Sequence, residues 1–234
     1  MLDRIDQVVL PGDDIRDITE KDTNQVILGP GLRREGEKVL VIKPGLLKRK
    51  DPGVYWIDSH QKRYVANRAD NVLGVVLSKA GDTFRVDIGT SEPASLSYLA
   101  FEGATKKNRP NVNTGDIVYA KLLVASRDME AELVCVDSYG KKAGLGVLTG
   151  GGYMFNVPLH TVRKMLSPDS VLLSTLGKSI QFEVAVGMNG RVWVRARTVK
   201  ETICLANAID CSEFMNNSEI EAMCSKLTDV LSNF

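Results

Sequence analysis

Short apolar runs, each closed by a turn residue, recur over the first 62 residues of the chain. The runs are Val8–Leu10, Val26–Leu28 and Val39–Ile42, and each is followed closely by glycine or proline. This pattern is typical of short β-strands joined by tight turns. Because no helical period accompanies the runs, we predict an N-terminal β-rich domain over residues 1–62.

Five further strand candidates lie between residues 63 and 139. They are Val72–Leu77, Phe84–Ile88, Ala94–Leu96, Ile117–Ala125 and Glu132–Val136. A long connection over residues 100–113 separates the third candidate from the fourth, and connections of that length are often functional. Five short strands with one long loop fit a Greek-key barrel of the OB type, so we predict such a barrel over residues 63–139.

The hydrophobic period changes after a glycine-rich link that begins at residue 140. Leu159, Val162 and Met165 share one face of a predicted helix, and Pro168 helps to end it. A turn over residues 167–169 separates this helix from a second one. The region therefore differs in class from the barrel that precedes it.

Two runs further along, residues 180–186 and 192–196, alternate in polarity as half-buried strands do. Asn189 and Gly190 lie between them, and this dipeptide predicts a hairpin turn with positive φ at both residues. The two runs therefore form the centre of a small antiparallel sheet.

Two capping boxes predict the helices that complete the region. Thr198 with Glu201, and Ser218 with Glu221, have the spacing at which side chains satisfy backbone amides at a helix start. Apolar residues at helical spacing follow each box. Helices together with a small sheet predict an α+β domain over residues 140–234.

Three strings closely resemble one protein family. They are Gly89-Thr-Ser-Glu-Pro-Ala-Ser-Leu-Ser-Tyr-Leu, Phe101-Glu-Gly-Ala-Thr-Lys-Lys-Asn-Arg-Pro-Asn-Val and Gly187-Met-Asn-Gly-Arg-Val-Trp-Val. With the order of the predicted domains, they resemble the eukaryotic exosome cap proteins that join an S1-type domain to a KH domain, and especially the smaller of the two such subunits. The resemblance covers essentially the whole chain. It implies a multidomain fold, mainly β plus α+β, with an S1-type OB barrel and a divergent KH domain.

The resemblance also implies a function without catalysis, and the scattered cysteines and histidines predict no metal or other cofactor. Such proteins sit on a ring of RNase PH-like subunits, beside the other cap subunits. They stabilise the ring and guide single-stranded RNA toward separate exoribonucleases, in RNA degradation and in processing that includes rRNA. The resemblance implies a location in the nucleus, the nucleolus and the cytoplasm.

Two alternatives belong to other functional classes. One is a free-standing S1/KH RNA-binding protein that acts in translation or RNA metabolism outside the exosome. The other is a phosphorolytic exoribonuclease with KH and S1 appendages. That enzyme would place KH before S1 and needs a large catalytic core upstream, for which about 62 residues are too few.

The distribution of charged residues indicates which segments could bind RNA. Lys and Arg total 30 against 29 acidic residues, so the formal net charge is only +1 and any RNA site has to come from local clustering. The long barrel loop carries the densest group of cations, and the glycine-rich link carries a second. The candidates are Lys106, Lys107, Asn108 and Arg109 in the loop and Lys141 and Lys142 in the link. Such side chains hold phosphates; the alternative in both places is an ordinary solvated loop.

Phe84 is the candidate for stacking on an RNA base. The resemblance implies this role, because S1 domains commonly use a phenylalanine on the second barrel strand. The alternative is that Phe84 belongs to the apolar core of the barrel.

A structural role is predicted for the last of the three strings. A KH domain holds RNA with a GxxG clamp between two helices, whereas Gly187–Gly190 lies between two strands and the turn 167–169 has no glycine pair. In the family the string packs against the S1-type domain. Gly187, Asn189, Gly190 and Trp193 are therefore predicted to join the two domains rather than to bind RNA.

The sequence offers no pattern for catalysis or for crossing a membrane. The four cysteines include no CxxC pair, the two histidines stand far apart, and reduced core thiols are the expectation. The N-terminus has no signal-peptide pattern, and no apolar stretch approaches about 18 residues. We expect a soluble intracellular protein with no membrane partner.

Overall fold

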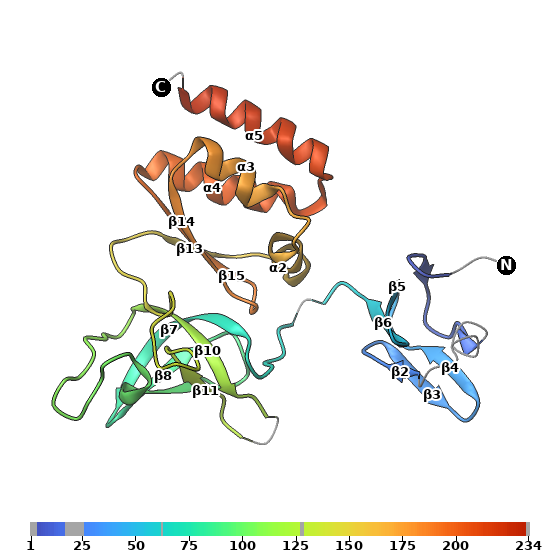
Figure 1. The fold of residues 1–234 in the computed structure, drawn as a ribbon, viewed down its shortest axis with the longest axis horizontal. Helices are drawn as coiled ribbons and strands as arrows, with labels where there is room; N and C mark the ends of the chain where they lie inside the picture. The colour runs from blue at the N-terminus through green and yellow to red at the C-terminus, as the bar shows by residue number, and fades with distance from the viewer. Residues whose placement is uncertain (1–3, 17–25, 62, 127–128, 233–234) are drawn as a thin grey trace. The chain divides into compact units, whose positions relative to one another are not determined.

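The computed structural model describes residues 4–16, 26–61, 63–126 and 129–232. The chain divides into two compact units, Met1–Gln61 and Lys62–Phe234 (Figure 1). The second unit contains both the barrel and the α+β region, so these two are packed together.

The described residues of the first unit form mainly β-strands, as predicted. One sheet has the order β1 (Val8–Val9), β5 (Gly45–Lys50), β6 (Val54–Asp58) and β2 (Ile27–Leu28). Strands β3 (Leu32–Glu35) and β4 (Lys38–Val41) form a separate hairpin. Their inward side chains share one core, made of Val9, Ile15, Leu32, Val39, Val41, Leu47, Tyr55 and Ile57.

The barrel occupies the first half of the second unit, as predicted. Its strands are β7 (Asn71–Ala80), β8 (Thr83–Asp87), β9 (Ala94–Ser97), β10 (Ile117–Val124) and β11 (Glu132–Val134). The sheet closes because β11 pairs in parallel with β9 and antiparallel with β10. A short 3-10 helix, η1 (Tyr98–Ala100), opens the long loop before β10.

Part of the glycine-rich link also belongs to the barrel. Strand β12 (Gly146–Val147) pairs with β10, and Leu145 is buried in the barrel core. Gly140, Gly144 and Gly146 all have positive φ, so this segment is tightly turned. The barrel thus continues beyond the predicted boundary at residue 139.

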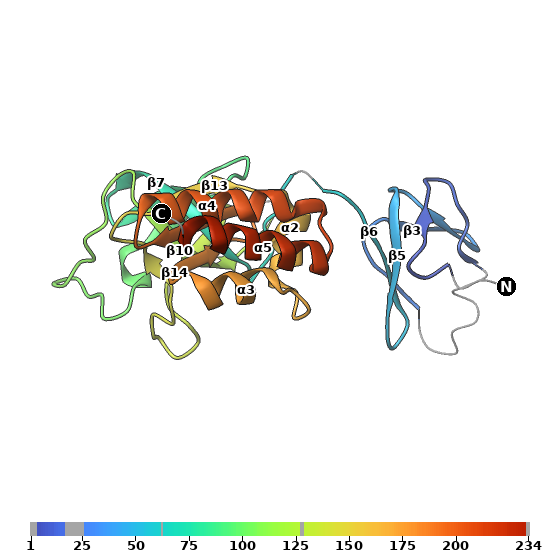
Figure 2. The same ribbon diagram turned by 90° about the horizontal axis from the view of Figure 1, so that it is seen from above.

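The α+β region has the strand and helix order of a KH domain. Its elements are β13 (Tyr153–Asn156), α2 (Leu159–Leu166), α3 (Leu172–Ser179), β14 (Phe182–Val186), β15 (Arg191–Ala196), α4 (Val199–Cys211), η2 (Ser212–Phe214) and α5 (Asn217–Ser232). The sheet order is β13-β15-β14. Seen from above, the helices α3, α4 and α5 cover this sheet (Figure 2), and an apolar core that includes Val192, Leu205 and Ile209 lies between them.

The first capping box is confirmed, and the second is wrong. At the start of α4, Glu201 N donates to Thr198 Oγ1 at 3.2 Å and Thr198 N donates to Glu201 Oε2 at 3.1 Å. Helix α5 begins at Asn217, so Ser218 lies inside it. Glu219 rather than Glu221 reaches back, accepting a hydrogen bond from Asn216 N at 2.8 Å.

The four cysteines differ in accessibility, which gives a first testable expectation. Cys135 is 1% exposed in the barrel core, and its burial raises the pKa of its thiol to about 12, although the charge of Lys142 acts in the opposite direction. Cys211 is exposed. Since only the thiolate reacts, a thiol reagent at pH 8 should label Cys211 within minutes and Cys135 only after unfolding. Mass spectrometry of the labelled peptides would measure both rates, and fast native labelling of Cys135 would contradict the burial.

Candidate nucleic-acid interface

The long barrel loop between η1 and β10 presents the first group of predicted cations. Lys106, Lys107, Asn108 and Arg109 are all exposed. Inside the loop, Asn108 N donates to Thr105 Oγ1 at 3.0 Å, and the Asn108 side chain donates to Gly103 O at 3.4 Å. Asn108 therefore holds the loop in shape, and the two lysines extend from it into solvent.

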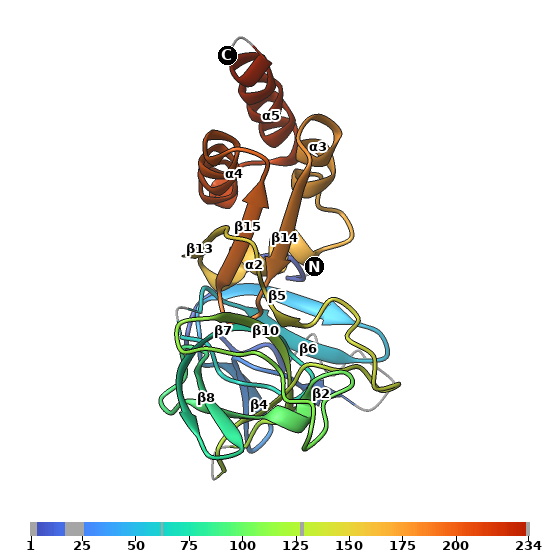
Figure 3. The same ribbon diagram turned by 90° about the vertical axis from the view of Figure 1, so that its left-hand side faces the viewer.

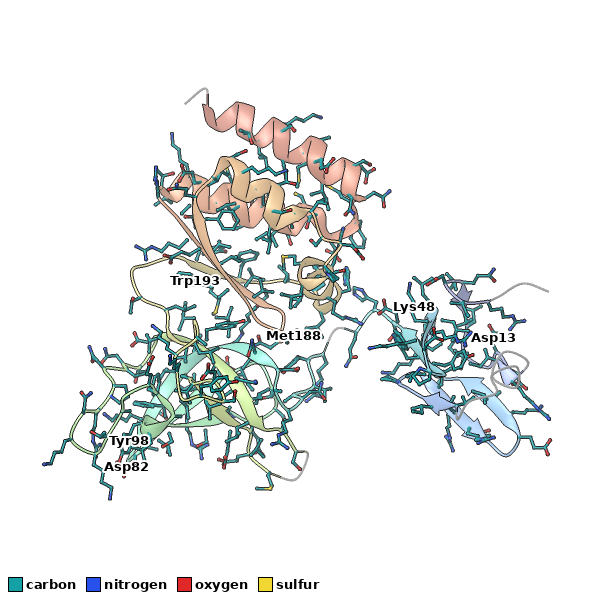
Figure 4. The ribbon with its side chains drawn as sticks, in the orientation of Figure 1. Asp13, Lys48, Asp82, Tyr98, Met188 and Trp193 are labelled. Atoms are coloured by element: carbon teal, nitrogen blue, oxygen red, sulfur yellow. The ribbon has the colours of Figure 1, made fainter. Side chains whose placement is uncertain are left out.

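Arg109 ties this loop to the hairpin between β7 and β8. Its guanidinium lies 3.1 Å from Asp82 Oδ1 and 4.8 Å from the centroid of the Tyr98 ring; Figure 4 shows Asp82 and Tyr98 together at this end of the barrel. Tyr98 is only 5% exposed. Arg109 is therefore partly occupied by an acidic partner, so Lys106 and Lys107 are the freer phosphate contacts.

The second predicted group lies on the loop between β11 and β12, where Lys141 and Lys142 are both exposed. Lys142 N donates to Glu102 Oε2 at 2.9 Å, across 40 residues of sequence. Cys135 N also donates to Ala100 O at 2.9 Å, just before the two loops diverge. The fold therefore brings the two cationic loops next to each other, which the sequence could not show.

Phe84 lies in the core of the barrel rather than on its surface. It is 2% exposed and packs among apolar residues of the neighbouring strands. Its ring is closed off from solvent, so it cannot stack on a base in this conformation. The structure therefore agrees with the alternative interpretation of Phe84, which does not belong to the candidate interface.

The outer face of β8, β9 and β11 is poorly suited to phosphate. OB barrels often bind single strands across this face, and here Arg85 stands on it between the hydroxyls of Ser78 and Ser95. Arg85 lies 3.5 Å from Glu130 Oε1, and Glu132 is exposed beside them. Carboxylates therefore offset the charge of Arg85 on this face.

The predicted joining residues do connect the barrel to the KH region. The turn between β14 and β15 reaches β7, which Figure 3 shows from the side. The Asn189 side chain accepts from Leu73 N at 3.2 Å and donates to Leu73 O at 2.7 Å and to Ile88 O at 2.8 Å. A Cβ on Gly187 would overlap Asn189 Oδ1, so this close approach requires glycine there.

The conformation of that turn differs from the prediction at one residue. Gly190 has φ +81, but Asn189 is not among the residues with positive φ. Gly190 N donates to Gly187 O at 3.1 Å and Gly187 N to Arg191 O at 2.8 Å. The turn is therefore longer than the two-residue type predicted, with its left-handed residue at Gly190 alone.

Two further residues strengthen this junction. Trp193 is 3% exposed and packs with Leu73 of the barrel and Ala185 of β14; Figure 4 labels it in the KH sheet, on the side toward the barrel. Arg191 donates to Asp87 Oδ2 at 2.7 Å. Burial alone would raise the pKa of the Asp87 carboxyl, but the bonds from Arg191 and Gly89 N and the charge of Arg191 lower it overall.

The KH region has no glycine clamp between its first two helices. The connection from α2 to α3 covers residues 167–171, whose sequence is Ser-Pro-Asp-Ser-Val. Ser170 N donates to Ser167 O at 3.1 Å in a tight turn. Without glycines the backbone cannot approach a nucleotide as a GxxG clamp does.

In the described part of the chain, no three His, Cys, Asp or Glu side chains come together as a metal site. No described helix has both the length and the apolar content needed to cross a bilayer.

Family models match three successive parts of the chain. Residues 7–60 match the N-terminal region of mammalian exosome complex component RRP40, residues 64–146 match the RRP40 S1 domain, and residues 152–200 match a KH domain. Together these matches follow the β-rich unit, the barrel and the α+β region in order.

Individual relatives show the same similarity over nearly the full length. Exosome complex component RRP40 of Bos taurus is 45% identical over 251 residues, covering 96% of this chain and 91% of that protein. RRP40 of Drosophila melanogaster is 48% identical, covering 96% and 97%, and that of Saccharomyces cerevisiae is 35% identical, covering 82% and 84%. A solved structure described as a putative exosome complex RNA-binding protein has a TM-score of 0.59 at 19% identity, covering 72% of this chain and 98% of that one, which supports the fold.

Proposed function

Because this chain belongs to the RRP40 family of exosome complex components, we propose that it is a non-catalytic exosome subunit that binds single-stranded RNA. The observation that carries the proposal is the hydrogen bond from Lys142 N to Glu102, which joins two exposed cationic loops of the S1-type barrel. Several lysines on adjacent loops hold a sugar–phosphate chain without reading its bases.

The remaining parts of the proposal concern assembly. We propose that the chain corresponds to the subunit called exosome component three. In that role it caps a ring of RNase PH-like subunits beside the other cap subunits, and passes RNA into the central channel toward associated exoribonucleases. We place it in the nucleus, the nucleolus and the cytoplasm. The near-neutral net charge supports weak binding alone and stronger binding inside the complex, where several sites act together.

The double change of Lys106 and Lys107 to alanine tests the RNA site. Each lost phosphate contact should reduce the slope of log affinity against log salt by about 0.7 on a single strand. We therefore expect a slope smaller by about 1.4 and an affinity for oligouridine about tenfold weaker at low salt. Fluorescence anisotropy with the full chain, from about 50 to about 200 mM salt, measures both quantities.

A matched control uses Lys178 and Lys226, which are exposed on α3 and α5. Changing both to alanine removes the same charge and should leave the salt slope within error. Arg109 is kept in both variants, because its contacts with Asp82 and Tyr98 hold the loop. Equal slopes for the two variants would exclude the loop as an RNA site.

Two further measurements test the rest of the proposal. The purified chain should leave labelled single-stranded RNA intact, and released nucleotides would contradict a non-catalytic role. In gel filtration of a cell extract the chain should migrate in a large complex. Migration as a small monomer would favour the free-standing RNA-binding alternative.

A further inference from the structure

Tyr139 is an exposed aromatic side chain on the second cationic loop. It is 87% exposed, and the hydrogen bond that the structure gives it involves its backbone amide. Its neighbours Ser138, Gly140 and Lys141 are also exposed, and none of them is apolar and large. The ring is therefore the one large apolar group in this exposed stretch of the loop.

The loop that carries Tyr139 is well ordered by its own hydrogen bonds. Asp137 Oδ1 accepts from Tyr139 N at 2.8 Å and from Lys141 N at 2.9 Å. Asp137 N donates to Lys141 O at 2.8 Å, and Gly140 N donates to Asp137 O at 3.1 Å. The Asp137 carboxylate is therefore occupied by the backbone, and the turn that carries Tyr139 has a defined backbone conformation.

Both ends of this loop are fixed in the barrel core. Cys135, before it, is 1% exposed, and Leu145, after it, is 6% exposed. The bond from Lys142 N to Glu102 Oε2 joins the loop to the one that bears Lys106 and Lys107. An exposed ring thus stands on the same loop as Lys141 and Lys142, and one hydrogen bond ties this loop to the loop that bears Lys106 and Lys107.

We propose that Tyr139 is a stacking platform for an unpaired RNA base, with Lys141 and Lys142 holding the adjacent phosphates. Every base has an aromatic face, so a ring next to cations binds single strands with little sequence preference. A ring presented by a preordered loop loses little conformational freedom on binding. This inference rests on the proposed RNA-binding function and identifies a base contact within it.

The test compares a base-bearing and a base-free polyanion. The full chain is titrated with an adenosine dodecanucleotide and with inorganic polyphosphate of similar length, at low salt. Changing Tyr139 to alanine should weaken the RNA about tenfold, in line with the loss of one stacked base, and should leave polyphosphate binding unchanged. Tyr139→Phe keeps the ring and should bind RNA within about twofold of the wild type, since stacking needs no hydroxyl.

A control variant, and the binding of each variant to both polyanions, distinguish failure of the stacking role from failure of RNA binding as a whole. Phe214 is 84% exposed on η2 of the KH region, and its change to alanine should alter neither titration. If Tyr139→Ala binds RNA as the wild type does, the stacking role is excluded while the proposed function stands. If it loses RNA and polyphosphate equally, Tyr139 only shapes the loop and the inference fails. If the wild type binds neither polyanion, the proposed function fails as well.

Discussion

Changing Trp193 to alanine is expected to lower the free energy of unfolding of the unit Lys62–Phe234 by about 3–5 kcal/mol. Trp193 is 3% exposed and contacts Leu73 of β7 and Ala185 of β14. Its loss removes apolar contact within the KH sheet and between that sheet and the barrel at the same time. The cavity left behind can close only if the two parts shift against each other.

The backbone around Trp193 shows how closely the indole is enclosed. A Cβ built on Gly152 would lie 2.6 Å from Trp193 Cε2, and Gly152 has φ +118. The segment that leads from the barrel into β13 therefore passes directly against the ring. Three segments distant in sequence depend on this one side chain.

Circular dichroism at the helix band during urea unfolding measures the effect. The helices α2 to α5, which the structure describes, all lie in this unit, so the signal reports on it rather than on the N-terminal unit. The control is Tyr153→Ala, which removes a ring that is 53% exposed on the adjacent strand. We expect that control to cost less than about 1 kcal/mol. A similarly small loss for Trp193→Ala would show that the ring does not hold the junction.

The barrel strands could be predicted because their buried and exposed residues alternate. In β8, Phe84 and Val86 are buried whereas Arg85 is exposed. The same alternation is enough to place Phe84 in the core, since it shares its face with Val86 and Ile88. The expectation of stacking came from the family pattern and not from the period.

Strands β5 and β13 were missed for a different reason. Strand β5 reads Gly-Leu-Leu-Lys-Arg-Lys, and Leu47 is its only buried residue. Strand β13 is at the edge of its sheet, and none of its four residues is fully buried. Each strand buries too few residues for its sequence to show the alternation of a half-buried strand.

The cations of the candidate interface could be predicted, but their arrangement could not. Lysines that are adjacent in sequence form a cluster that the sequence alone reveals. The bond between Lys142 N and Glu102 spans 40 residues and depends on how the barrel closes. Tyr139 gave no signal, because a single aromatic residue in a glycine-rich link belongs to no pattern. Only the structure shows that the Tyr139 side chain is exposed on a hydrogen-bonded turn.

Changing Asn189 to alanine is expected to destabilise the same unit by about 2–4 kcal/mol, through polar groups left without partners. The Asn189 amide is bonded to Leu73 N, Leu73 O and Ile88 O. Leu73 and Ile88 are both 0% exposed, so water cannot easily replace the lost bonds. The same urea experiment measures this variant. Asn156→Ala removes an exposed amide at the end of β13 and should cost about 0.5 kcal/mol or less.

Changing Asn189 to aspartate tests the same hydrogen bonds, because it replaces the side-chain amide with a group that can carry a negative charge. It keeps the acceptor for Leu73 N but replaces the donor to Leu73 O and Ile88 O with a carboxylate oxygen. Facing two carbonyls in a partly buried site, the new carboxyl should have a pKa above its unfolded value of about 3.9. A raised folded-state pKa contributes stability below the unfolded pKa and loses it as the pH rises through the folded pKa. We therefore expect Asn189→Asp to be more stable relative to Asn189→Ala at pH 4 than at pH 7, and a pH-independent difference would contradict the bonding assigned to Asn189.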